Sequence, residues 1–123
     1  MTSIAQLQPV RKRFQHLSPP HLPLILLDVD GHIQHLTPIA RRLLEFDEDD
    51  LIDPLFVSHV HGKNLHQISR DLDAMRRLGK QKAFWLARVR TGQGRWAWFR
   101  IVAENRLQRP ERTIVLRLRD LHD

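Results

Sequence analysis

Asp28 and Asp30 are the residues whose types and spacing most directly suggest chemistry. They follow the apolar residues 24–27, and in this arrangement one carboxylate could attack a phosphoryl group while the other transfers a proton. Such a reaction also needs a cation for the phosphate and further acids for magnesium. The residues that could take these roles are Asp49, Asp50, Lys63 and Lys80.

The same two aspartates also fit a purely structural role. Asp30 and Gly31 are a strong signal for a hairpin turn between two short apolar segments. An aspartyl phosphotransferase needs a parallel sheet with helical crossovers, whereas the C-terminal part of this chain is typical of consecutive antiparallel strands. We therefore predict a hairpin here and no enzymatic activity.

The eight histidines raise the question of a metal site. His32 and His35 are three residues apart on an expected strand, which places them on opposite faces. His59 and His61 share a face only if the chain is extended there. Because zinc sites need three or four convergent ligands, we predict no metal site and regard these histidines as surface residues.

The composition is that of a single globular domain with an uneven charge distribution. The 123 residues include no cysteine, which excludes disulfides and cysteine-based sites and agrees with a cytoplasmic location. No apolar run approaches the roughly 18 residues needed to span a bilayer. The net charge is +6, with acids concentrated in residues 45–53 and bases in residues 80–119. Without a recognised binding motif, we do not expect nucleic acid to be the partner.

The chain divides into residues 1–21 and residues 22–123. In the first part, Val10, Phe14 and Leu17 recur at helical spacing, which predicts an N-terminal helix and linker with one narrow apolar stripe. Residues 24–28 and 32–37 are the predicted hairpin strands.

Several helices should follow the hairpin. Thr37 is a suitable cap for a short helix that begins at Pro38. The acidic residues 47–52 predict a further helical turn. Asn64 is the expected cap of the longest helix, which Gly79 should end. The apolar face of that helix comprises Leu65, Ile68, Leu72, Met75 and Leu78.

Three strands are expected at residues 82–90, 95–105 and 113–121. The fold class is therefore α+β, a five-stranded antiparallel sheet with helices between strands two and three, plus the N-terminal helix. Alternation in the last strands places one wholly apolar face toward the helices. The other face mixes tryptophan with arginine, which is typical of an interface. Its candidate interface residues are Trp96, Trp98, Arg100, Arg117 and Arg119, together with Val10, Phe14 and Leu17 of the N-terminal helix.

Four short motifs, in this order and spacing, resemble those of PAS domains. They are residues 26–33 (LLDVDGHI), 60–64 (VHGKN), 94–98 (GRWAW) and 119–122 (RDLH). The resemblance spans residues 24–123. The chain departs from the family pattern at Gly62, where proline is usual, at Asn64, where aspartate is usual, and at Leu121-His122, where Ile-Thr is usual.

The resemblance implies a sensory and dimerisation module that regulates a fused or separate effector, such as a kinase, a cyclase or a transcription regulator. It implies a homodimer formed through the N-terminal helix or the outer sheet face, and a small cavity between sheet and helices. The candidate cavity residues are Leu72, Met75, Trp85, Phe99 and Leu116, although simple core packing explains them better. The alternative is a stand-alone ligand or haem receptor with His66, or else His61, as the haem ligand; neither haem nor flavin is required.

Overall fold

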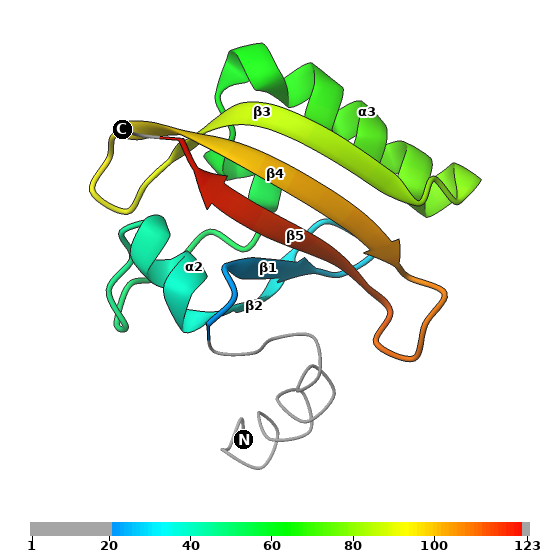
Figure 1. Ribbon diagram of the computed structural model, residues 1–123, viewed down its shortest axis with the longest axis horizontal. Coiled ribbons are helices and arrows are strands. Elements are labelled where there is room, and N and C mark those ends of the chain that lie inside the picture. Colours follow the sequence, from blue (N-terminus) through cyan, green and yellow to red (C-terminus); the bar gives the residue numbers. More distant parts are fainter. Residues whose placement is uncertain (1–20, 122–123) are drawn as a thin grey trace.

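The computed structural model describes residues 21–121, and Figure 1 shows how the elements are arranged. The predicted N-terminal helix with Val10, Phe14 and Leu17 lies outside the described residues. The strands are β1 (Leu24–Leu27), β2 (Ile33–Leu36), β3 (Lys82–Arg90), β4 (Trp96–Arg106) and β5 (Thr113–Asp120). The helices are α2 (Pro38–Leu43), the 3-10 helix η1 (Phe56–His59) and α3 (Gly62–Leu78). None of these helices is long and apolar enough to cross a membrane.

The five strands form one sheet in the order β2-β1-β5-β4-β3, and each neighbouring pair is antiparallel. The helices come between β2 and β3 in the chain, so the predicted fold class is confirmed. In Figure 1, α3 runs along β3, while α2 lies beside β1 and β2. The last three strands agree with the predicted ranges to within one residue at each end.

Asp28 stabilises the hairpin turn that joins β1 and β2. Its Oδ1 accepts hydrogen bonds from the backbone N–H groups of Asp30 and His32, each at 2.9 Å. Gly31 adopts a φ of 82°, which favours glycine because a side chain there is strained. The Asp28 side chain and Gly31 therefore shape the turn, and the predicted antiparallel hairpin is confirmed.

Thr37 caps α2, as predicted from its place before Pro38. Its Oγ1 accepts a hydrogen bond from the backbone N–H of Ala40, and also one at 2.9 Å from the N–H of Leu24 in β1. The hydroxyl donates in turn to the carbonyl oxygen of Leu22. Because Thr37 is completely buried, this one side chain joins the start of the sheet to the start of the helix.

The acidic segment after α2 is an exposed turn, and the prediction of a helical turn over residues 47–52 is wrong. The Asp50 carboxylate accepts the backbone N–H of Asp47 at 2.7 Å, and Asp53 accepts that of Leu55 at 2.9 Å. Aspartate side chains that bond the nearby backbone compete with helix formation. The acids therefore stabilise a loop here.

The start of α3 also differs from prediction, because His61 is its cap and Asn64 lies inside the helix. The Nδ1 atom of His61 accepts the backbone N–H of Lys63. The Asn64 side chain instead accepts two hydrogen bonds from Arg88 of β3, from its backbone N–H at 2.9 Å and from Nε at 3.3 Å. The backbone N–H of His61 donates to the Arg88 carbonyl oxygen. These contacts join the start of α3 to the edge of the sheet.

The buried stripe of α3 is shorter than the helical period of its apolar residues predicts. Ile68 and Met75 are fully buried and Leu72 is partly buried, but Leu65 and Leu78 are exposed. Gly79 ends the helix in the left-handed conformation with φ 73°, as predicted. The backbone carbonyls of Met75 and Lys80 accept hydrogen bonds from the Asn105 side chain of β4, which fixes this end of the helix to the sheet.

Candidate functional site

The outward surface of β3, β4 and β5 is the most distinctive feature of the molecule. Strand alternation places nine aromatic, aliphatic and arginine side chains there, and we call this surface the tryptophan–arginine face. It consists of Phe84, Leu86, Arg88, Arg90, Trp96, Trp98, Arg100, Arg117 and Arg119. The opposite surface of the same strands is buried in the main core beneath the helices.

The strand register determines which side chains of the face meet. Arg88 pairs with Trp98 across β3 and β4, and its guanidinium carbon lies 4.6 Å from the centroid of that indole. Arg90 pairs with Trp96 in the same way at 6.0 Å. These distances fit cation–π interactions, which orient both the indole rings and the arginines.

The apolar members of the face are exposed to an unusual degree. Trp96 and Trp98 are 43% and 44% exposed, Leu86 is 56% exposed and Phe84 is 66% exposed. Large apolar side chains that gather on one surface are typical of an interaction site, because leaving them in water is unfavourable. Tryptophan and arginine are also the residues most enriched among those that dominate binding energy.

His61 links this face to α3. Its ring packs edge-on against Trp96, with 4.8 Å between the ring centroids and 69° between the planes. Desolvation, followed by the positive charges of Arg88 and Lys63, lowers the pKa of His61 below its ordinary value. The neutral ring is the form that caps the helix, since Nδ1 must accept the N–H of Lys63. Protonation would therefore remove the cap.

The interior beneath the sheet is filled by the residues that could have lined a ligand cavity. Met75, Trp85, Phe99 and Leu116 are all buried to within 2% and belong to one core cluster. The indole N–H of Trp85 donates to Asp71 of α3 at 2.8 Å. A cavity of about 10 Å³ remains near Phe56 and Val89, and none of the five candidate residues lines it. That volume is about the smallest that holds a single water molecule.

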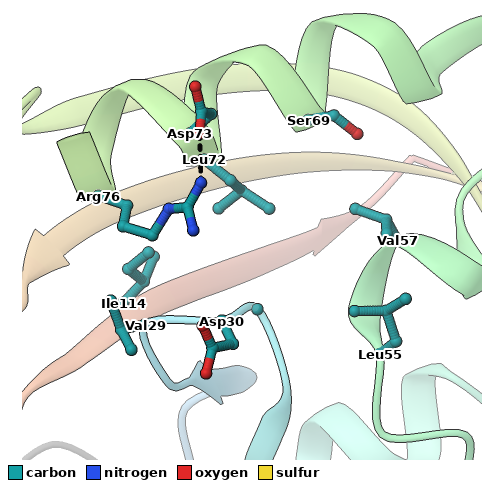
Figure 2. A pocket seen from close by; sticks show the side chains of 10 residues that line it. Val29, Asp30, Leu55, Val57, Ser69, Leu72, Asp73, Arg76 and Ile114 are labelled. Atoms are coloured by element: carbon teal, nitrogen blue, oxygen red, sulfur yellow. Dashed lines mark hydrogen bonds and ion pairs between the residues drawn. The ribbon is translucent and has the colours of Figure 1, made fainter. Parts of the chain in front are cut away.

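A larger cleft of about 240 Å³ lies outside this core, between α3 and the β1–β2 turn. Its apolar walls come from Val29, Leu55, Val57, Leu72 and Ile114. Figure 2 shows the guanidinium group of Arg76 directed from α3 toward the hairpin turn, with Asp73 paired to it. The hydrogen bond from Arg76 lowers the pKa of Asp73, so this carboxylate is ionised at neutral pH. The cleft thus combines an apolar lining with one arginine, Arg76, and two carboxylates, Asp30 and Asp73, of which Asp73 is paired with Arg76.

The histidines between residues 21 and 121 do not converge on the core. His66, the first candidate haem ligand, is exposed on α3, and the ring of His61, the second, is engaged by Lys63 and Trp96. Asp28, Asp30 and His32 form the single group of potential metal ligands found among residues 21–121. Both oxygens of Asp28 already accept hydrogen bonds within the turn, Oδ2 from Gln34.

The sequence pattern identified part of this surface and missed part of it. Trp96, Trp98, Arg100, Arg117 and Arg119 were predicted on the outer face, and the structure places them there. The contribution of β3 was missed, although alternation of Lys82–Arg90 would have placed Phe84, Leu86, Arg88 and Arg90 outward as well. Of the predicted cavity residues, Leu72 lines the cleft. No sequence signal marked the rest of it, because its walls come from four separate segments.

Comparison with known proteins defines the fold. No family model and no curated protein matches the sequence. The PAS domain of an HTR-like protein from Haloarcula marismortui is 14% identical, with a TM-score of 0.67 over 95% of this chain and 96% of that one. A domain of a sensory box sensor histidine kinase/response regulator from Geobacter sulfurreducens is 16% identical, with a TM-score of 0.66 over 94% of each chain.

A third similar structure is the PAS domain of the quorum-sensing receptor RpfR from Cronobacter turicensis, solved in complex with BDSF. It is 15% identical, with a TM-score of 0.64 over 86% of this chain and 99% of that one. The chain therefore has the PAS fold.

Proposed function

We propose that this chain is a PAS-type sensory and protein-interaction module, which regulates a fused or separate effector through contacts made by the tryptophan–arginine face. The observation that carries the proposal is the exposure of two tryptophans, a leucine and a phenylalanine among five arginines on that face. The similar structures include a domain of a sensor histidine kinase, which supports a role in signalling.

A chain of contacts connects the proposed binding surface to the helical layer. Arg88 lies against Trp98 on the face and donates two hydrogen bonds to Asn64 of α3. His61 contacts Trp96 and caps the same helix. A partner that displaces either indole would therefore act on the N-terminal end of α3. Two arrangements of these contacts would be enough to carry a signal, because a partner that prefers one of them shifts the population.

Trp98→Asp should reduce self-association through this face. Replacing a central interface tryptophan by a charge removes a contact of at least about 2 kcal/mol, which corresponds to a roughly thirtyfold weaker association. Light scattering after gel filtration should show the particle mass falling to that of one chain, 14.6 kDa.

The matched control for this experiment is Leu78→Asp. Leu78 is 80% exposed and lies on α3, away from the face. This control should keep the wild-type mass, and circular dichroism should show both variants folded. If Trp98→Asp has the same mass as a wild-type dimer, the face is not the interface.

A second candidate function, the binding of a small amphipathic carboxylate, is favoured by the cleft beside α3. Its apolar walls suit a short hydrocarbon chain, and the guanidinium of Arg76 suits a carboxylate. One of the similar structures, the quorum-sensing receptor domain, was solved in complex with BDSF. The filled core of this chain directs attention to the cleft as the place for such a ligand.

Titration with hexanoate, followed by NMR, tests this candidate. We expect the shifted amides to be those that line the cleft, and Arg76→Gln should weaken binding at least tenfold. Arg77→Gln is the matched control, because Arg77 pairs with the same Asp73 but does not line the cleft. Equal affinity of the two variants for hexanoate, or shifts elsewhere, would contradict the assignment.

A further inference from the structure

We propose that the tryptophan–arginine face binds the acidic loop, residues 47–53, of a second copy of this chain, so that copies associate head to tail. This inference rests on the proposed function, in which the face is a protein-binding surface, and it adds the identity of the partner. Two surfaces of opposite charge, each carrying exposed apolar side chains, support it.

The charge of the face argues against its pairing with the same face of another copy. Including Lys82 at the end of β3 and Arg106 at the end of β4, the outward side chains of β3, β4 and β5 carry seven bases. Within the described residues, their single acid is Glu104, which already pairs with Arg106 at 2.8 Å. Arg100 and Arg119 lie directly opposite each other in the register. A symmetric contact would bury these like charges against one another, at a cost of several kcal/mol.

The acidic loop has the complementary character. It contains five acids and no base, and all five are exposed: Asp47, Glu48, Asp49, Asp50 and Asp53. Leu51 projects among them and is fully exposed, with a relative accessibility of 102%. A leucine surrounded by carboxylates matches the tryptophan–arginine face, because the leucine can pack against the exposed Leu86 and Trp98 while the carboxylates pair with the neighbouring arginines.

The loop is held in a defined shape, which reduces the entropic cost of docking. Asp50 bonds the backbone of Asp47, and the Arg41 side chain donates to the Asp47 carbonyl oxygen at 3.1 Å. Glu48, Asp49 and Leu51 make none of these internal bonds and remain available for a partner. A preorganised segment loses less conformational freedom on binding than a flexible one.

The positions of the two surfaces require the contact to be between molecules. Phe46, just before the loop, and Ile52, within it, pack against the core on the helix side of the sheet. The tryptophan–arginine face lies on the other side of the same sheet, so a chain cannot bring its own loop onto its own face. Each copy therefore offers one loop and one face, and the association is heterologous.

Mixing two differently impaired variants tests this geometry. Trp98→Asp disrupts the face but leaves the loop intact, whereas Glu48→Lys with Asp49→Lys reverses the loop charge and leaves the face intact. We expect each variant alone to have the mass of one chain at a concentration where the wild type assembles. An equimolar mixture should form two-chain particles, because one intact face can then bind one intact loop.

The salt dependence of the mixed particle and a control variant complete the test. Raising the salt from about 0.05 M to about 0.5 M should dissociate the mixed particle, because the contact depends on surface charges that salt screens. Gln67→Lys, an added charge at an exposed site on α3, should leave the wild-type mass unchanged. Circular dichroism should show every variant folded.

Three outcomes would overturn the inference. If the loop variant keeps the wild-type mass while Trp98→Asp becomes a single chain, the face pairs differently; the proposed function survives but the loop is not its partner. A mixture that remains at the mass of one chain also excludes the head-to-tail contact. A wild type that stays monomeric but is retained by single-stranded DNA in a salt-dependent way would make nucleic acid the partner.

Discussion

Phe99→Ala should lower the free energy of unfolding by about 3 to 5 kcal/mol, the usual cost of deleting a buried phenylalanine ring. Phe99 is completely buried and lies in β4, where the register pairs it with Ala87 of β3. The small side chain of Ala87 cannot fill the space that the ring leaves, so a cavity would form in the main core. Because domains of this size are stable by about 5 to 15 kcal/mol, urea denaturation should show a large decrease in the midpoint.

Two further variants show whether the loss of stability comes from lost core packing or from removing any aromatic ring of the sheet. Phe84→Ala removes a ring that is 66% exposed and should change the stability by about 0.5 kcal/mol or less. Phe99→Leu keeps most of the buried volume and should be less destabilising than Phe99→Ala. If Phe84→Ala and Phe99→Ala have equal effects, the assignment of the two faces of the sheet is wrong.

Thr37→Val should lower the free energy of unfolding by about 2 to 4 kcal/mol, although the two side chains have nearly the same shape. The hydroxyl caps α2, and loss of such a cap costs about 1 kcal/mol. It also bonds the backbone groups of Leu24 and Leu22. Valine would leave the Leu24 N–H buried without its acceptor, which costs about 1 to 3 kcal/mol more.

Thr37→Ser is the control for this prediction, because serine keeps the hydroxyl and loses only a methyl group. Thermal or urea unfolding of the two variants should show the serine variant much closer to the wild type. Hydrogen exchange at the Leu24 amide should become faster in Thr37→Val alone. Equal destabilisation by serine and valine would mean that the methyl group, not the hydroxyl, is what Thr37 contributes.

The parts of the fold that could be predicted from the sequence are those with local causes. Asp30-Gly31 can adopt the hairpin turn without help from the rest of the chain, and Thr37 lies next to the helix that it caps. Gly79 ends α3 because of its own left-handed conformation. The alternation in β4 and β5 likewise identified the tryptophans of the outer face without any knowledge of strand pairing.

The errors that concern α3 have long-range causes. Asparagine is a residue type that often caps helices. The Asn64 side chain, however, accepts a hydrogen bond from Arg88, 24 residues later, and the helix begins earlier, at Gly62. Leu65 and Leu78 fit the helical period, yet α3 extends beyond the core at both ends, so they remain in solvent. The cleft could not be predicted for the same reason, since its walls depend on how separate segments pack.

Gly92, in the β3–β4 turn, gives another example of a contact that periodicity does not reveal. A Cβ atom at this position would lie 2.3 Å from the backbone oxygen of Glu45 and 2.7 Å from the ring of Phe46. The backbone N–H of Gly92 donates to the Leu44 carbonyl oxygen at 2.8 Å. Glycine is needed at position 92 because the turn lies directly against the end of α2 and leaves no space for a Cβ atom. Backbone conformation is not the reason, since the φ of Gly92 is not in the left-handed range.

The bonds between α3 and Arg88 have a consequence for how the protein can aggregate. β3 is an outer strand of the sheet, and an outer strand usually offers unpaired backbone groups to which another chain can add. At Arg88 the backbone N–H and carbonyl oxygen are already bonded to Asn64 and His61, and Val60 forms a bridge with Val89. This end of the strand is therefore closed to strand addition, which protects this part of the sheet edge against amyloid-like growth and leaves the outward face for specific recognition.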